Sequence, residues 1–127
     1  MIKLFTNQIE IHPLHLDAFT NGTLDQCLEN GIRPMAWSPL GGGRIFNSED
    51  QIGGRVLACL NDLRDKYDAS PDQLIFAWLM KHPSNIYPIL GTTKMNRVES
   101  AVQALEINMD RQDWYKIWTT ATGKEVA

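Results

Sequence analysis

The stretch WSPLGGGR at residues 37–44 marks the end of a strand and the start of a loop suited to holding a ligand. The apolar residues Ile32, Met35 and Ala36 lead into it and predict a strand over residues 32–37. The three successive glycines let the backbone approach a bulky anionic group that side chains would exclude. Phosphate fits such a loop, although flexible turns use glycine equally often. The rest of the chain has to decide between a binding loop and an ordinary turn.

A second candidate loop follows the strand predicted over residues 86–90. The segment Gly91–Arg97 joins the end of this strand to the start of a helix, where free backbone N–H groups and the helix dipole favour an anion. Its side chains add two hydroxyls and two cations: Thr92, Thr93, Lys94 and Arg97. Thr93 or a neighbour could instead only cap the helix, with both cations in water. The segment lacks the Walker A pattern of P-loop proteins.

The order of the predicted elements is typical of parallel α/β structure. In chain order these are a buried strand over residues 3–11, a helix over 23–31, the strand over 32–37, a helix from Ser48 to Tyr67, a helix from Ser70 to just before Pro83, the strand over 86–90, a helix around 98–105 and a last helix from Asp110 to Gly123. Alternating strands and helices favour right-handed crossovers between parallel strands. Ligands then bind beyond the carboxyl ends of the strands, where both loops lie. The two loops could therefore line one site.

Two helix starts carry capping signals. Thr23 and Gln26 have the spacing of a capping box. Ser70-Pro71-Asp72-Gln73 combines a capping serine, a proline at the first helical position, an acid in the first turn and a glutamine three residues after the cap. The last helix is expected to turn four side chains inwards: Trp114, Ile117, Trp118 and Ala121.

Composition limits the class of protein. The chain has 127 residues, 43% of them hydrophobic, which suffices for one domain with a core. The net charge of -3, with scattered cations, argues against a nucleic-acid partner. No run approaches the roughly 18 apolar residues of a membrane span, so we expect a soluble, cytoplasmic protein without a membrane partner. Cys27 and Cys59 lie at apolar helix positions and predict two packed thiols in a reducing compartment.

Individual polar and aromatic residues leave alternatives open. Trp37 could fill the core or present its ring to a planar heterocycle. Gln8 lies on the same strand face as Glu10, and a buried glutamine there could bond Glu10, a backbone group or the amide of a ligand. His12 and His15 flank a Pro-Leu pair, but a metal site needs a further ligand and no candidate stands out. We therefore expect two loop histidines and no metal.

Three ordered stretches carry a family resemblance: Asn7-Gln8-Ile9-Glu10-Ile11-His12-Pro13, Met35-Ala36-Trp37-Ser38-Pro39-Leu40-Gly41-Gly42-Gly43, and Pro88-Ile89-Leu90-Gly91-Thr92-Thr93-Lys94 with Arg97. With this order and spacing the chain resembles the carboxyl-terminal half of an aldo-keto reductase, particularly the bacterial branch of predicted NADP-dependent oxidoreductases. The similarity covers essentially the whole chain. It implies one domain over residues 1–127, a partial (β/α)8 barrel whose three parallel strands resemble strands 6–8. The resemblance implies that strands 1–5 of the barrel are absent from this chain. The last helix resembles the family's carboxyl-terminal cap.

The resemblance also implies a cofactor site. Gln8 matches the glutamine that bonds the nicotinamide carboxamide, and Trp37 matches the aromatic residue that stacks under the nicotinamide ring. Thr92 and Arg97 match the grip on the 2′-phosphate of NADP(H), which Lys94 would assist. The full expected cofactor-binding set is Gln8, Trp37, Ser38, Pro39, Leu40, Gly41, Gly42, Arg44, Gly91, Thr92, Thr93, Lys94 and Arg97.

Three positions depart from the family pattern. Gly91 stands where the family often has lysine. Ser100 and Ala101 replace the acidic or amide residue and the asparagine usually found near the adenine. The preference for NADP over NAD therefore stays open.

The same resemblance implies no catalytic residue in this chain. The family's tyrosine acid and its supporting lysine, aspartate and histidine belong to the first four or so strand–helix units. The complete protein would reduce an aldehyde or ketone, whereas the chain alone would bind nucleotide without turnover. Strand character close after Met1 indicates a truncated reading frame, and the open sheet edges favour self-association. The alternative is a non-enzymatic fragment that pairs with a separate amino-terminal half.

Overall fold

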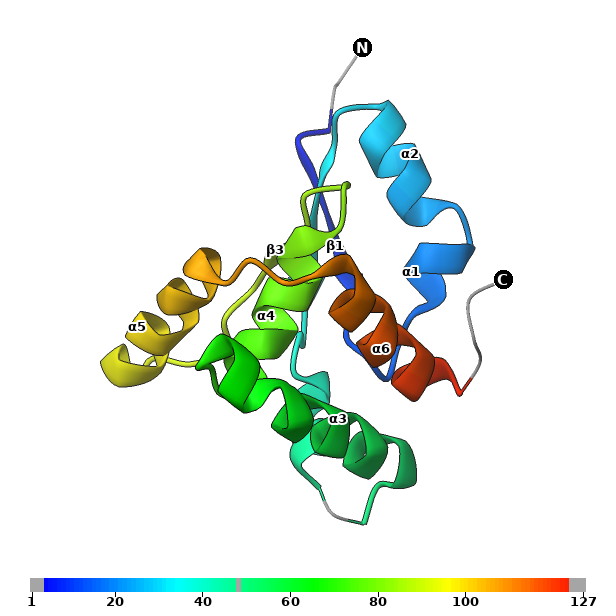
Figure 1. The fold of residues 1–127 in the computed structure, drawn as a ribbon. Helices are drawn as coiled ribbons and strands as arrows, with labels where there is room; N and C mark the ends of the chain where they lie inside the picture. Colours follow the sequence, from blue (N-terminus) through cyan, green and yellow to red (C-terminus); the bar gives the residue numbers. More distant parts are fainter. Residues whose placement is uncertain (1–3, 48, 124–127) are drawn as a thin grey trace.

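A parallel sheet of three short strands forms the centre of the computed structural model, which describes residues 4–47 and 49–123. The strands are β1 (Thr6–Glu10), β2 (Arg33–Trp37) and β3 (Tyr87–Pro88), in the order β1-β2-β3. The remaining elements are α1 (Asp17–Thr20), α2 (Thr23–Glu29), the 3₁₀ segment η1 (Gly41–Phe46), α3 (Gln51–Tyr67), α4 (Pro71–Lys81), α5 (Met95–Gln103), the 3₁₀ segment η2 (Ala104–Glu106) and α6 (Arg111–Thr122). Figure 1 shows α4 between α5 and α6, with α3 running beneath them.

The two faces of the sheet differ in burial. Ile9 pairs with Ala36 in the register, and both pack into the core beneath the helices. Side chains alternate along a strand, so the next pairs, Gln8 with Met35 and Glu10 with Trp37, point to the opposite face. Gln8 and Trp37 are exposed there. The sheet therefore presents one apolar face to the helices and one polar and aromatic face to solvent.

The strands are shorter and less covered than the sequence predicts. The expectation of a buried strand over residues 3–11 is wrong: β1 runs from Thr6 to Glu10, its first three residues are exposed, and Lys3 lies outside the described residues. β1 is an edge strand, so it pairs on one side only. The strand predicted over residues 86–90 is reduced to Tyr87–Pro88, because proline has no N–H to donate to a ladder.

Helix starts follow the capping signals in part. The box at Ser70 is confirmed, since the Ser70 backbone N–H donates to Gln73 Oε1 at 3.0 Å. Thr23 is not a cap, because Gly22 takes the left-handed position before α2 with φ of 88°. The Thr23 N–H instead donates to Asn21 Oδ1 at 2.9 Å. Asn21 can supply this acceptor from two residues earlier because its side chain is short.

The N-cap of α3 lies two residues beyond the expected serine. Ser48 falls outside the described residues, and Asp50 is the N-cap. Its Oδ1 accepts a hydrogen bond from the Gly53 N–H at 2.8 Å. Of the apolar positions of this helix, Ile52 is 40% exposed, whereas Val56 and Leu60 are fully buried. The first turn of α3 is therefore held by its cap and not by apolar packing.

Stacked indoles join α4 to α6 in the core. Trp78 is completely buried and stacks on Trp114 with ring centroids 5.0 Å apart. Each indole N–H donates to the backbone carbonyl of the other residue, at 3.0 and 2.8 Å. Trp118 also stacks on Trp114, with ring centroids 5.7 Å apart. The predicted inward face of the last helix is confirmed at Ile117 and Ala121, which are buried.

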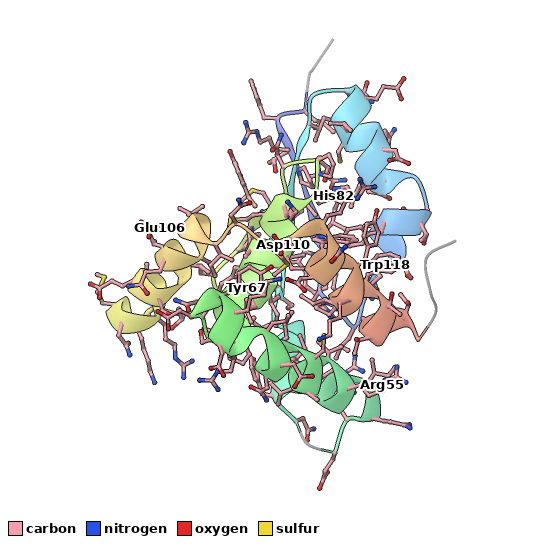
Figure 2. All side chains as sticks on the ribbon, in the orientation of Figure 1. Arg55, Tyr67, His82, Glu106, Asp110 and Trp118 are labelled. Atoms are coloured by element: carbon pink, nitrogen blue, oxygen red, sulfur yellow. The ribbon has the colours of Figure 1, made fainter. Side chains whose placement is uncertain are left out.

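A polar cluster closes the same helix onto α3. Lys66 Nζ lies 2.7 Å from carboxylate oxygens of both Asp110 and Asp113. The Tyr67 hydroxyl donates to Asp113 and accepts the Asp110 backbone N–H at 2.8 Å. Figure 2 shows Tyr67 and Asp110 meeting where α3 ends and α6 begins. This cluster fixes the first turn of α6.

Two further expectations concern thiols and membranes. Cys27 and Cys59 are buried free thiols. Among the helices of residues 4–47 and 49–123, none is long and apolar enough to cross a membrane.

Candidate functional site

The loops that follow β2 and β3 line one cleft of about 490 Å³. This volume lies within the range of small-molecule sites, roughly 300–1,000 Å³. The predicted residues that line it are Ser38, Pro39, Leu40, Gly42, Gly91, Thr92 and Arg97. The structure therefore brings together the two loops that the order of elements places at the carboxyl ends of the strands.

Backbone conformation explains the glycines of the first loop. Gly41, Gly42 and Gly43 have φ values of 67°, 62° and 90°, in the left-handed region that favours glycine. A side chain on Gly41 would also meet the His12 ring, since an added Cβ would lie 3.3 Å from Nδ1. The loop thus bends back against His12, and Gly41 itself is buried.

The His12 side chain packs against this loop. It is only 2% exposed, and its Nδ1 accepts the Leu14 N–H at 3.2 Å. In the neutral ring the proton therefore sits on Nε2, which lies 3.0 Å from Glu10 Oε1. Burial lowers the pKa of His12 and outweighs the opposing hydrogen bond to Glu10. His12 lies in the loop between β1 and α1, as expected, and is a neutral, buried residue packed against the glycine loop.

The second histidine completes a small polar network. His15 Nδ1 lies 3.6 Å from Glu10 Oε2, and its backbone N–H donates to the His12 carbonyl at 2.9 Å. Glu10 thus lies between two imidazoles at the carboxyl end of β1. Over the described ranges, no cluster of three or more histidine, cysteine or carboxylate side chains could hold a metal ion.

Trp37 and Gln8 lie outside the cleft, on the open face of the sheet. Trp37 is 43% exposed at the last position of β2, so the core alternative for its ring is wrong. Gln8 is exposed, which corrects the expectation of a buried glutamine. Its suggested partner, Glu10, is bonded to His12 instead. Both side chains are therefore accessible to a ligand that extends past the end of β2.

The remaining predicted cations and hydroxyls are exposed around the cleft. Arg44 Nε donates to Asp50 Oδ2 at 3.0 Å. The Gly53 N–H and then Arg44 lower the pKa of Asp50, so this carboxylate is charged and competes with any anion for Arg44. Thr92 Oγ1 accepts the Lys94 N–H at 3.1 Å in a local turn ahead of α5. The N-cap of α5 is Lys94, and no side chain caps this helix, so the capping alternative for Thr93 or a neighbour is wrong. Thr93 and Lys94 are exposed outside the cleft lining.

The sequence pattern did not single out the walls of the cleft that come from α4 and α5. Phe76 is 5% exposed, and it packs with Ala101 and Leu90 into an apolar floor. Asp72, one turn before Phe76, adds a carboxylate to the same wall. The i, i+4 spacing of these two residues places them on one helix face and was the available signal. Asp72 was instead assigned only to the helix start.

Comparison with known proteins identifies the family. Residues 1–120 match the model of the aldo/keto reductase family. This chain belongs to the aldo/keto reductase family. Among curated relatives, it is 43% identical over 125 residues to a 6-dehydroglucose reductase of Agrobacterium fabrum and 40% identical over 125 residues to the oxidoreductase YdhF of Escherichia coli. These matches cover 98% and 97% of this chain but only 41% of each relative.

Solved aldo/keto reductases share the fold. A thermostable aldo-keto reductase crystallised with the inhibitor epalrestat superposes with a TM-score of 0.77 at 23% identity, over 91% of this chain and 39% of that one. An aldose reductase from Giardia lamblia gives 0.73 at 27% identity, over 97% and 39%. The resemblance drawn from the three motifs is confirmed, as is the α/β fold with three parallel strands. The chain spans about two fifths of the length of these aldo/keto reductases.

One cluster contains a tyrosine, a lysine and an aspartate, the residue types expected around the family's proton donor, but it is not suited to donate a proton. Tyr67, Lys66 and Asp113 are bonded together at the end of α3. Burial, followed by the hydrogen bond to Asp113, raises the pKa of Tyr67, whereas a tyrosine acid needs a lowered pKa. Tyr67 and Lys66 also line a separate hollow away from the two loops. In this aldo/keto reductase chain, the cluster therefore has a structural role: it links the end of α3 to the start of α6.

Proposed function

We propose that this chain forms the NADP(H)-binding part of an aldo/keto reductase, whose complete protein transfers hydride between NADPH and an aldehyde or ketone. The observation that carries the proposal is the single cleft formed by the loops after β2 and β3. Nicotinamide nucleotides bind at the carboxyl ends of parallel strands in barrels of this kind. One relative, 28% identical over 123 residues, is named an NADP-dependent D-sorbitol-6-phosphate dehydrogenase of Malus domestica, which agrees with this cofactor.

The residues of the cleft, together with those on the open face of the sheet beside it, suit the separate parts of a dinucleotide. The apolar floor of Phe76, Leu90 and Ala101 fits a flat base. The glycine backbone and the Arg97 guanidinium fit phosphate oxygens. The exposed indole of Trp37 offers a face for a nicotinamide ring, with the Gln8 amide two residues from the end of the neighbouring strand. Bound NADPH would supply the hydride, and these residues would position it.

Carbonyl reduction also needs a proton for the product oxygen. We assign no catalytic residue to this chain, because Tyr67 has a raised pKa and lies away from the cleft. The proton donor is therefore proposed to come from the part of the barrel that the matched relatives have beyond the aligned 41%. The carbonyl substrate would contact that part as well.

A titration tests the nucleotide site. Purified chain is titrated with NADPH while nucleotide fluorescence and tryptophan quenching are followed. Removing the ring in Trp37→Ala should weaken binding about three- to tenfold, the usual contribution of one aromatic stack. Trp37→Phe keeps a ring and is the matched control, expected to retain most of the affinity. Absence of saturable NADPH binding by the unmodified chain, with its helical signal intact, would contradict the proposed function.

A second candidate function is a non-enzymatic fragment that pairs with a separate amino-terminal half. The exposed apolar side chains of α5 and η2 favour it, since Val102 and Leu105 are 56% and 69% exposed. Both sheet edges within the described residues are also free to pair. Sedimentation of the chain alone and mixed with the first part of a relative's barrel tests this candidate. If the chain sediments as a monomer both alone and in the mixture, pairing and self-association are both contradicted.

A further inference from the structure

One acidic side chain stands in a cleft otherwise suited to anions. Among the described residues that line the cleft, Asp72 is the only carboxylate and Arg97 the only cation. Asp72 is half-buried, and the Ser70 hydroxyl donates to its Oδ1. In the part of the chain that the structure describes, Oδ2 has no assigned partner. The carboxylate therefore has one oxygen to offer to a ligand.

The position of this carboxylate relative to Arg97 is fixed by two linked helices. Gln73, the next residue, donates from Nε2 to the Ser100 carbonyl at 2.8 Å and to Gln103 Oε1 at 3.2 Å. These bonds tie the first turn of α4 to α5, and Arg97 lies in the first turn of α5. Phe76 and Ala101 pack the two helices together below. Asp72 and Arg97 thus face one cleft from a rigid helix pair.

A carboxylate in this place acts differently on the two nicotinamide nucleotides. A 2′-phosphate carries close to two negative charges and is repelled by Asp72 while it is attracted by Arg97. A free 2′-hydroxyl can instead donate a hydrogen bond to a carboxylate, which is how acidic residues hold the ribose of NAD in other folds. Asp72 also occupies the first turn of α4, where it offsets the attraction of that helix end for phosphate. All three effects favour the nucleotide without the phosphate.

We propose that Asp72 is a specificity-determining residue that reduces the preference of the cleft for a nucleotide carrying a 2′-phosphate, so that the chain binds NADH alongside NADPH. This inference rests on the proposed function, because it concerns the same cleft. A purely structural role for Asp72, as the acid of a helix start, would change the affinity for both nucleotides equally.

The test compares two nucleotides on two matched variants. Asp72→Asn removes the charge and keeps the shape. Asp25→Asn is the control, because Asp25 is also an acid in the first turn of a helix but lies on α2, outside the cleft lining. NADPH and NADH are titrated at one fixed, low ionic strength, and the helical signal and thermal midpoint of each variant are recorded. Asp72→Asn should raise the ratio of the NADH to the NADPH dissociation constant about fivefold, the effect of one charge pair near 4 Å in water.

The outcomes separate the two proposals. A raised ratio in Asp72→Asn with an unchanged ratio in Asp25→Asn supports the inference. An unchanged or lowered ratio in a folded Asp72→Asn overturns it, and so does an equal rise in both variants, which would mark an effect of net charge alone. Failure of every form of the folded chain to bind either nucleotide overturns the proposed function and this inference together.

Discussion

Gly53 lies where the first turn of α3 meets the glycine loop, and its replacement by alanine tests how tightly these two elements are packed. An added Cβ would lie 2.4 Å from the Arg44 backbone carbonyl oxygen. Carbon and oxygen normally approach to about 3.3–3.6 Å, so the overlap is about 1 Å. The same Cβ would lie 3.2 Å from Asp50 Oδ1, the acceptor that caps the helix. Gly53→Ala must therefore move η1 away from α3 or loosen the cap.

The expected magnitude combines opposing contributions. Alanine gains about 1 kcal/mol of helix propensity over glycine. Overpacking costs about 1–3 kcal/mol, and a weakened cap costs about 1 kcal/mol more. Gly53→Ala should therefore lower the free energy of unfolding by about 1–3 kcal/mol. Gly54→Ala is the matched control at the adjacent helical position, where an added Cβ meets nothing within 4 Å. It should raise the stability by about 0.5–1 kcal/mol.

Urea unfolding followed by far-ultraviolet circular dichroism measures both variants against the parent chain. The midpoints should move in opposite directions at unchanged slope. NADPH binding should weaken in Gly53→Ala and not in Gly54→Ala, because only the former displaces the loop that lines the cleft. A Gly53→Ala chain as stable as the parent, or a shift of both variants in the same direction, would refute the packing argument.

Two further predictions concern pH. Desolvation disfavours the charged form of Asp113, but hydrogen bonds from Lys66 and Tyr67 outweigh this effect and lower the pKa of the carboxyl group. The carboxylate therefore stabilises the fold above about pH 4, and this contribution is lost as pH falls through the lowered pKa. Asp113→Asn should cost about 1–3 kcal/mol at pH 7 and flatten the fall of the urea midpoint below pH 4, and an unchanged pH profile would contradict this. Burial lowers the pKa of His12 while Glu10 opposes the shift, so Glu10→Gln should lower that pKa further in an NMR titration of the ring, and a rise would disprove the network.

Local signals in the sequence predicted the helices better than the strands. The capping box at Ser70 and the inward face of α6 depend on residues within one or two helical turns, so they can be predicted from the local sequence. The strand at 3–11 reads as buried because apolar residues dominate it, yet burial depends on what covers the sheet. β1 lies at an edge with one face open, so Gln8 is exposed and the strand shortens. Pairing partners distant in sequence decide such features.

The candidate site shows the same division. Loop residues such as Gly42 and Thr92 were predicted because strand order places both loops at one end of the sheet. Asp72 and Phe76 were missed as cleft residues, because their role depends on how α4 packs against α5. His12 was correctly assigned to a loop, but its burial was not predicted, because that burial arises from the return of the glycine loop over it. Each of these features needs a contact between separate segments.

The tryptophans of this chain divide into two optically distinct groups. Trp78, Trp114 and Trp118 form one continuous stack between α4 and α6. Trp37 stands apart at the end of β2 and is open to solvent. Parallel indoles at such distances couple their electronic transitions, which gives a circular dichroism band that disappears when α6 undocks. The isolated indole should emit at longer wavelength and be quenched first by a water-soluble quencher. The protein therefore carries one optical reporter for the integrity of its core and another for the occupancy of its proposed ligand face.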